Sequence, residues 1–183
     1  MRLQELNKIN IEGMNPKKAA VLLLFFPNKY KETSFVLIQR KKYPGVHSHQ
    51  IAFPGGKVEE NDKDLAHTAL REAEEEVGIA SRKVKLLRSL TEVYIPPSNF
   101  MVTPFIGFSN FYPDFRAQPS EVEQIIEVTL EEFLDDTIVI TQNLTTSYAK
   151  NIEVPAFILK GHTVWGATAM MLSEAKELIK ESM

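Results

Sequence analysis

The chain has 183 residues, of which 44% are hydrophobic and 25% charged, enough apolar material for one folded domain with its own core. With 21 Lys and Arg against 24 Asp and Glu, the net charge of −3 argues against a protein that binds DNA or RNA through bulk positive charge. The absence of cysteine excludes disulfides, thiol catalysis and cysteine-ligated zinc or iron–sulfur sites.

Residues 1–18 are polar with scattered Leu and Ile, and we expect an N-terminal extension compatible with a short helix. They lack the apolar core and the small-residue cleavage site of a signal peptide. The longest apolar run, Ala19–Phe26, ends at Pro27 and is far shorter than the roughly 17–25 residues of a membrane span. We therefore expect a soluble, cytoplasmic protein with no membrane partner, whose folded domain covers residues 19–183.

Apolar, partly β-branched runs of strand length follow along the chain. We predict strands at residues 19–26, 34–40, 51–53, 84–93, 101–108, 121–129, 137–141 and 152–159. A polar loop covers residues 41–50, and Pro54-Gly55-Gly56 stops the third strand. Besides the helix described next, we predict a short helix at 130–134 and a closing amphipathic helix at 167–179. Many strands with few, separated helices favour an α+β fold, or mixed-sheet sandwich, over a regular βαβ array.

The clearest predicted helix runs from Asp64 to Val77. It is rich in Ala, Leu, Glu and Arg, contains no Pro or Gly, and stops at Gly78, as a helix C-cap would. At roughly 100° per residue, Glu72, Glu75 and Glu76 share one arc of this helix. The apolar stripe lies beside that arc and consists of Ala66, Ala69, Leu70, Ala73 and Val77. The acidic arc therefore borders the core face of the helix.

Three carboxylates this close repel one another unless a positive charge joins them. Arg71 lies one turn before Glu75 and can pair with it. Oxygen-only donors suit hard cations such as Mg²⁺ or Mn²⁺, and Mg²⁺ keeps coordination positions for water and substrate phosphate. Upstream, Gly55-Gly56 lets the backbone approach an ion or phosphate closely. The alternatives are a solvated acidic helix face and a plain tight turn.

Residues 56–79 resemble the Nudix box, whose usual form is G-x5-E-x7-R-E-U-x-E-E-x-G-U, with U an aliphatic residue. The half from Arg71 to Ile79 matches in full, with Ala73 at the first U. The segment from Gly56 to Arg71 is one residue longer than usual, and the first acidic position falls on Asp62 or is shifted.

The segment before the box is similar to that of coenzyme A pyrophosphatases, which read R-S-x-x-L-R-x-H-x-G-Q-U-x-F-P-G-G. The matching positions are Arg40, His47, Gln50 and Phe53–Gly56. Gly45 stands in place of the second Arg of the pattern, and His49 in place of the Gly before Gln. Residues 94–100 and 164–169 are similar to later segments of the same group, so the likeness covers roughly residues 20–180.

The resemblance implies a Nudix-type α/β/α sandwich, with a mixed sheet between the helix at 64–77 and the helix at 167–179. It also implies a Mg²⁺ site, with Mn²⁺ as a substitute. The implied metal ligands are Glu72, Glu75, Glu76 and the Gly56 carbonyl.

By the same resemblance, Glu72 and Arg71 are catalytic residues, with Arg71 orienting the carboxylates. The proton of the attacking water is accepted either by a box glutamate or by a carboxylate from a later loop. Glu121 is the candidate in that loop, and the alternative is that Glu121 is a solvated residue at the start of a strand. The implied substrate-binding residues are Arg40, His47, Phe53 and Gly55, with a core position as the alternative for Phe53.

The implied reaction is Mg²⁺-dependent hydrolysis of a pyrophosphate bond in a nucleoside diphosphate derivative. Coenzyme A or acyl-coenzyme A, giving 3′,5′-ADP and (acyl-)4′-phosphopantetheine, is the first expectation. ADP-ribose, NADH or a nucleoside triphosphate is the alternative, and a non-catalytic nucleotide-binding module is a third reading. The expected partner is a small nucleotide, not a nucleic acid, and a homodimer stays open.

Overall fold

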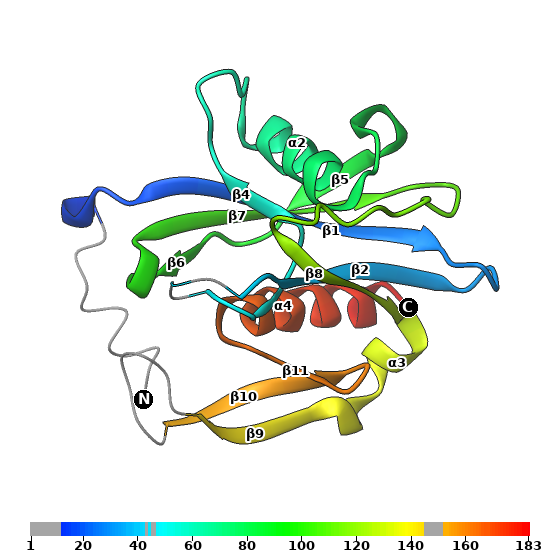
Figure 1. The fold of residues 1–183 in the computed structure, drawn as a ribbon. Coiled ribbons are helices and arrows are strands. Elements are labelled where there is room, and N and C mark those ends of the chain that lie inside the picture. Colours follow the sequence, from blue (N-terminus) through cyan, green and yellow to red (C-terminus); the bar gives the residue numbers. More distant parts are fainter. Residues whose placement is uncertain (1–11, 43, 45–46, 145–151) are drawn as a thin grey trace.

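A computed structural model describes residues 12–42, 44, 47–144 and 152–183 (Figure 1). The short helix expected within residues 1–18 lies mostly outside this range, and Glu12–Met14 forms a single 3-10 turn, η1. No helix within the described ranges is both long and apolar enough to span a membrane.

The main sheet is built around the apolar strand β1 (Lys17–Pro27). Its order is β3-β2-β1-β7-β5, and β4, β6 and β8 pair with β1, β7 and β2 respectively. The bounds are β2 Thr33–Arg40, β3 Ile51–Ala52, β4 Gly55–Lys57, β5 Lys85–Ser89, β6 Val93–Ile95, β7 Phe100–Phe108 and β8 Val122–Thr129. Strands β1 and β7 run parallel and the other pairs antiparallel, so the sheet is mixed, as predicted.

Helices cover both faces of this sheet (Figure 1). Helix α2 (Leu65–Val77) lies on one face and α4 (Gly166–Ser182) on the other. Beyond α4 lies a second sheet of order β11-β10-β9, which the sequence did not predict as a separate layer. Its strands are β9 Val139–Leu144, β10 Ile152–Leu159 and β11 His162–Trp165, and the short helix α3 (Leu130–Leu134) leads into it. The predicted α/β/α sandwich is confirmed, and α4 is covered by sheet on both sides.

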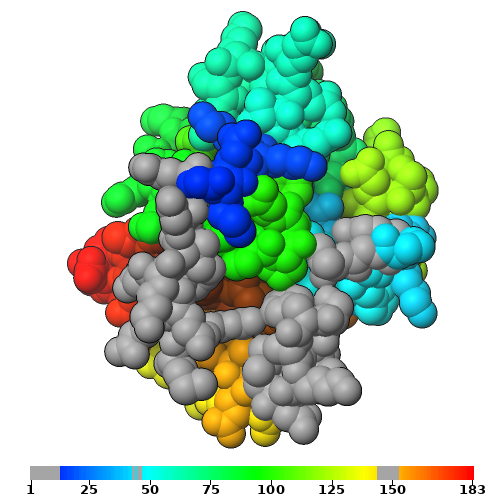
Figure 2. Space-filling view, turned by 90° about the vertical axis from the view of Figure 1, so that its left-hand side faces the viewer, coloured from blue at the N-terminus to red at the C-terminus, as the bar shows by residue number. Residues whose placement is uncertain are grey.

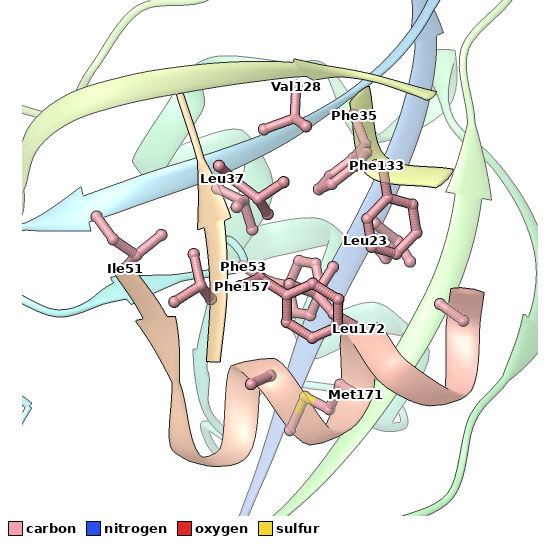
Figure 3. Packing of buried hydrophobic residues seen from close by; sticks show 14 of the residues in the cluster. Leu23, Phe35, Leu37, Ile51, Phe53, Val128, Phe133, Phe157, Met171 and Leu172 are labelled. Atoms are coloured by element: carbon pink, nitrogen blue, oxygen red, sulfur yellow. The ribbon is translucent and has the colours of Figure 1, made fainter. Parts of the chain in front are cut away.

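Alternation along β1 divides the core in two, because successive side chains of a strand point to opposite faces. Ala20, Leu22, Leu24 and Phe26 contact the cluster under α2. Leu23 and its neighbours of the same parity face α4, where Phe35, Leu37, Phe157 and Leu172 complete a second cluster (Figure 3).

Two expectations about strands are corrected, and one strand had no prediction. The single strand at 84–93 is two strands, β5 and β6, since Thr91 N donates to the Glu174 carboxylate of α4 and leaves the sheet. Gly55 and Gly56, expected to stop the third strand, belong to the strand β4. His162–Trp165, with no prediction, forms β11 against β10. Such short strands depend on partners that are distant in sequence.

Candidate active site

Helix α2 carries the acidic cluster, and local signals fix both of its ends. The Asp64 side chain accepts a hydrogen bond from His67 N at 2.7 Å, and Gly78 closes the helix with φ 77°. These caps match the sequence prediction. The helix buries Glu72 and Glu76 against the sheet and leaves Glu75 half exposed.

Strand β4 passes directly over the Glu72 carboxylate. A Cβ on Gly56 would overlap that carboxylate, and a Cβ on Gly55, whose φ is 153°, would overlap the β1 backbone. Gly55 is therefore required by its backbone conformation and by the close approach of β1, whereas a side chain at Gly56 would displace the Glu72 carboxylate. Because both glycines belong to β4, the plain-turn alternative is wrong.

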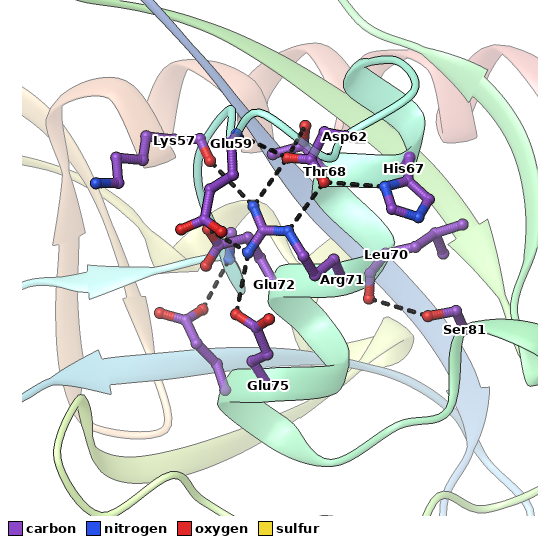
Figure 4. Close-up of polar contacts among 12 residues, drawn as sticks. Lys57, Glu59, Asp62, His67, Thr68, Leu70, Arg71, Glu72, Glu75 and Ser81 are labelled. Carbon is purple, nitrogen blue, oxygen red and sulfur yellow. Dashed lines mark hydrogen bonds and ion pairs between the residues drawn. The ribbon is translucent and has the colours of Figure 1, made fainter.

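Arg71 ties this helix to the loop that precedes it (Figure 4). Its Nη1 lies 3.1 Å from Glu72 Oε1 and 3.0 Å from Glu75 Oε2, and its Nη2 donates to Lys57 O at 3.1 Å. The predicted pairing with Glu75 is present, and the guanidinium also joins Glu72. A positive charge thus already lies between two of the three carboxylates.

Asp62 is the strongest partner of Arg71. Nε and Nη2 of Arg71 donate to the two Asp62 oxygens, each at 2.9 Å, and Thr68 Oγ1 and Glu59 N also donate to this carboxylate. The Arg71 hydrogen bonds hold the pKa of Asp62 far below its usual range. Because these donors already occupy its oxygens, Asp62 holds Arg71 in position. The first acidic position of the box therefore has a structural role in this protein.

Glu76 is held by a different set of donors. Its Oε2 accepts from Gly55 N at 2.8 Å, and its Oε1 lies 3.6 Å from Arg40 Nη1. Burial raises the pKa of Glu76 to about 7, against the opposing effects of Arg40 and of the Gly55 amide. Burial likewise raises the pKa of Glu72, against the opposing charge of Arg71.

Glu121 lies at the start of β8, close enough to act on this cluster. Its charge raises the pKa values of both Glu72 and Glu76, although Glu121 itself is exposed. The loop candidate for the proton acceptor is therefore brought to the acidic helix from a distant part of the chain.

The donor set fits a hard divalent cation. The carboxylates of Glu72, Glu75 and Glu76 outnumber the guanidinium groups of Arg40 and Arg71 that pair with them, and the charge of Glu121 acts on the same cluster. This surplus of negative oxygen donors suits Mg²⁺ or Mn²⁺. Within the described residues, no three acidic or histidine side chains converge as a ready-made ligand set, because the carboxylates are turned toward the arginines.

A pocket of about 300 Å³ borders β4 on the α4 side of the sheet. It brings together the predicted substrate residues Arg40, His47, Phe53 and Gly55 with Gly56, the predicted carbonyl ligand of the metal. Phe53 is 1% exposed and packs in the core cluster, as its alternative interpretation predicts, and it also forms part of the pocket wall.

The rest of the pocket wall is mostly apolar and comes from distant elements. Members include Val21, Ile95, Phe100, Val102, Trp165 and Met171. Figure 2 shows two of these distant segments: the brown chain near residue 165, where α4 begins, lies below the green chain near residue 100. The segments 94–100 and 164–169 were indicated by resemblance, whereas no sequence signal marks Val21, Val102 or Met171, whose place depends on β1–β7 pairing and on the docking of α4.

Comparison with known proteins points to one family. The model of the NUDIX domain matches residues 16–145. Nudix hydrolase 22, chloroplastic, of Arabidopsis thaliana is 33% identical over 90% of this chain and 56% of its own length. The uncharacterized Nudix hydrolase NudL of Photorhabdus laumondii is 32% identical over 91% of this chain and 87% of its own length. The mitochondrial coenzyme A diphosphatase NUDT8 of Homo sapiens is 29% identical over 90% and 70%.

This chain spans about half the length of the two Arabidopsis relatives, Nudix hydrolases 15 and 22. Among solved structures, the Nudix hydrolase RenU of M. smegmatis superposes with a TM-score of 0.62 at 16% identity, covering 91% of this chain and 87% of its own. A MutT/nudix family protein from Enterococcus faecalis gives 0.59 at 19%, covering 91% and 63%. These superpositions show the fold, and with the domain match and the NudL relative they establish that this chain belongs to the Nudix family.

Proposed function

We propose that the protein hydrolyses the pyrophosphate bond of a nucleoside diphosphate derivative. The observation that carries this proposal is the pair of buried carboxylates, Glu72 and Glu76, which contact the glycines of β4 from one side while the same glycines line a pocket of about 300 Å³ on the other. Buried acids bordering a pocket are typical of sites that hold cations or move protons.

Glu72, Glu75, Glu76 and the Gly56 carbonyl would hold Mg²⁺, for which Mn²⁺ could substitute. A bound divalent ion supplies charge neutralisation at phosphate and a more acidic water. Arg71, fixed by Asp62, holds Glu72 and Glu75 in place. The carboxylate of Glu121 or Glu72 accepts the proton of the attacking water.

Coenzyme A or acyl-coenzyme A is the proposed substrate, giving 3′,5′-ADP and (acyl-)4′-phosphopantetheine. The sequence pattern before β4 and the coenzyme A diphosphatase among the relatives support this choice. Arg40, His47 and Gly55 would face the substrate, and the apolar wall suits an uncharged arm beside the diphosphate. ADP-ribose, NADH and nucleoside triphosphates are the alternatives.

A substrate panel with Mg²⁺ tests the proposal. Coenzyme A, acetyl-coenzyme A, ADP-ribose, NADH and ATP are incubated separately, and the products are resolved by chromatography and mass. We expect 3′,5′-ADP from the first two at the highest kcat/KM. Preference for another compound would reject coenzyme A and keep the reaction class, and hydrolysis of none would reject the activity.

Glu72→Gln and Glu76→Gln test the site itself. Each removes a charged oxygen donor while keeping side-chain size, and we expect kcat to fall by at least about 10²-fold. Glu177→Gln, an exposed position on α4, is the matched control and should retain full activity. Activity of either box variant at the level of the control would contradict the assignment.

A further inference from the structure

Arg40 joins three elements at the mouth of the pocket. From the end of β2, its Nη2 donates to Gly55 O at 2.7 Å, and its Nη1 lies 3.6 Å from Glu76 Oε1. The Gly55 amide in turn donates to Glu76 Oε2 at 2.8 Å. Arg40, Gly55 and Glu76 thus form a closed polar ring across β2, β4 and α2.

The charges in this ring are unequally buried. Glu76 is 1% exposed and Arg40 25%, and Glu72 and Glu121 add repulsion to the Glu76 carboxylate. Across the part of the chain that the structure describes, Arg40 supplies the ion pair that Glu76 makes, whereas Arg71 is engaged with Asp62, Glu72 and Glu75. A buried carboxylate without a counter-charge is costly, so Arg40 stabilises Glu76 when no metal is bound.

We propose that Arg40 is the resident counter-ion of Glu76, which a divalent cation displaces when it binds this carboxylate. The displaced guanidinium stays at the pocket, whose wall Arg40 already forms, and is then free to pair with a substrate phosphate. Glu76 exchanges one cation for another, and Arg40 exchanges a carboxylate for a phosphate, so the charge balance is kept. The second exchange rests on the proposed function; the first does not.

The first exchange predicts competition between Arg40 and the metal. Removing the guanidinium should therefore tighten metal binding, although it weakens the metal-free fold. We expect Arg40→Gln to bind Mg²⁺ about three- to tenfold more tightly than the wild type in isothermal titration calorimetry. The titration is done at pH 9, because burial raises the pKa of Glu76 to about 7 and protons would otherwise compete for it.

Two variants control this measurement. Lys41→Gln removes the same charge from the next residue, whose 2.9 Å pair with Glu123 is exposed, and it should leave the Mg²⁺ affinity unchanged. Arg40→Lys keeps the charge and should bind Mg²⁺ within about twofold of the wild type. An Arg40→Gln protein that binds Mg²⁺ as weakly as Lys41→Gln, or more weakly than the wild type, overturns the proposal; in the latter case Arg40 would organise the ligands instead of competing.

The outcome separates this inference from the proposed function. Mg²⁺ affinity is measured without substrate, so it reports on Arg40 and Glu76 even if the whole substrate panel fails. Conversely, a protein that hydrolyses coenzyme A while its Arg40→Gln variant shows no gain in Mg²⁺ affinity would keep the activity and reject the counter-ion.

Discussion

Single residues of α2 have roles that their spacing alone only partly reveals. The helical arc correctly groups Glu72, Glu75 and Glu76, and it places them beside the apolar stripe. The arc does not show that Glu72 lies under a glycine of β4 or that Arg40 pairs with Glu76, because both contacts are made by other strands. The sequence accordingly predicts which carboxylates lie next to the core face of α2, but not which cations pair with them.

Asp62 provides a test at the residue scale, because it is a buried carboxylate that pairs with Arg71. Asp62→Asn leaves Arg71 without its bidentate partner, and we expect a loss of about 3 kcal/mol of unfolding free energy at pH 7 in urea denaturation. Asp114→Asn is the control, because Asp114 pairs with Arg116 at an exposed position, and its effect should be close to zero.

The same pair also sets a pH dependence. Because the pKa of Asp62 is lowered in the folded state, its contribution is complete above the unfolded pKa of about 4 and is lost as the pH falls below it. The stability of the wild type should thus decline from about pH 5 downward, and Asp62→Asn should show a shallower decline. Parallel declines in the two proteins would contradict this role.

Elements with local signals were predicted well, and elements that depend on partners were not. Asp64 and Gly78 cap the two ends of α2, and each cap depends only on residues a few positions away in the sequence. By contrast, β4 and β11 have three and four residues, too few to show a pattern before their partners are known. The predicted strand at 84–93 failed for a related reason, since a helix carboxylate binds Thr91 between its two parts.

The C-cap of α2 is testable with a matched pair of glycines. Gly78 and Gly161 both have φ 77°, but a Cβ on Gly78 would lie 3.2 Å from the Arg116 Cβ, whereas a Cβ on Gly161 meets nothing within 4 Å. We expect Gly161→Ala to cost about 1 kcal/mol of stability, from the left-handed backbone alone, and Gly78→Ala to cost more. Equal melting temperatures for the two variants would show that the Arg116 contact is unimportant.

At the scale of the molecule, the sandwich followed from family resemblance, and the second sheet did not. Helix α4 is shared by both sheets, because Leu172 lies in one cluster with Phe35 of the main sheet and Phe157 of β10. The apolar spacing of α4 predicts a buried face but does not say how many layers it will contact.

This shared helix predicts a single cooperative unfolding transition. Leu172→Ala should lower the unfolding free energy by about 2–5 kcal/mol, whereas Met170→Ala, at a half-exposed position on the same helix, should change it by less than about 0.5 kcal/mol.

Trp165, the sole tryptophan, precedes α4, so its fluorescence and far-UV circular dichroism should report coincident transitions. Separate transitions would mean that the two sheets unfold independently.

The glycines of β4 separate two compartments that belong to opposite faces of one sheet. The acids of α2 lie on one side, and the apolar wall from β7 and α4 on the other. A substitution in α4 or its surroundings therefore changes the pocket wall without a contact to the carboxylates of α2. Two backbone positions without side chains thus divide the acidic cluster from the apolar wall.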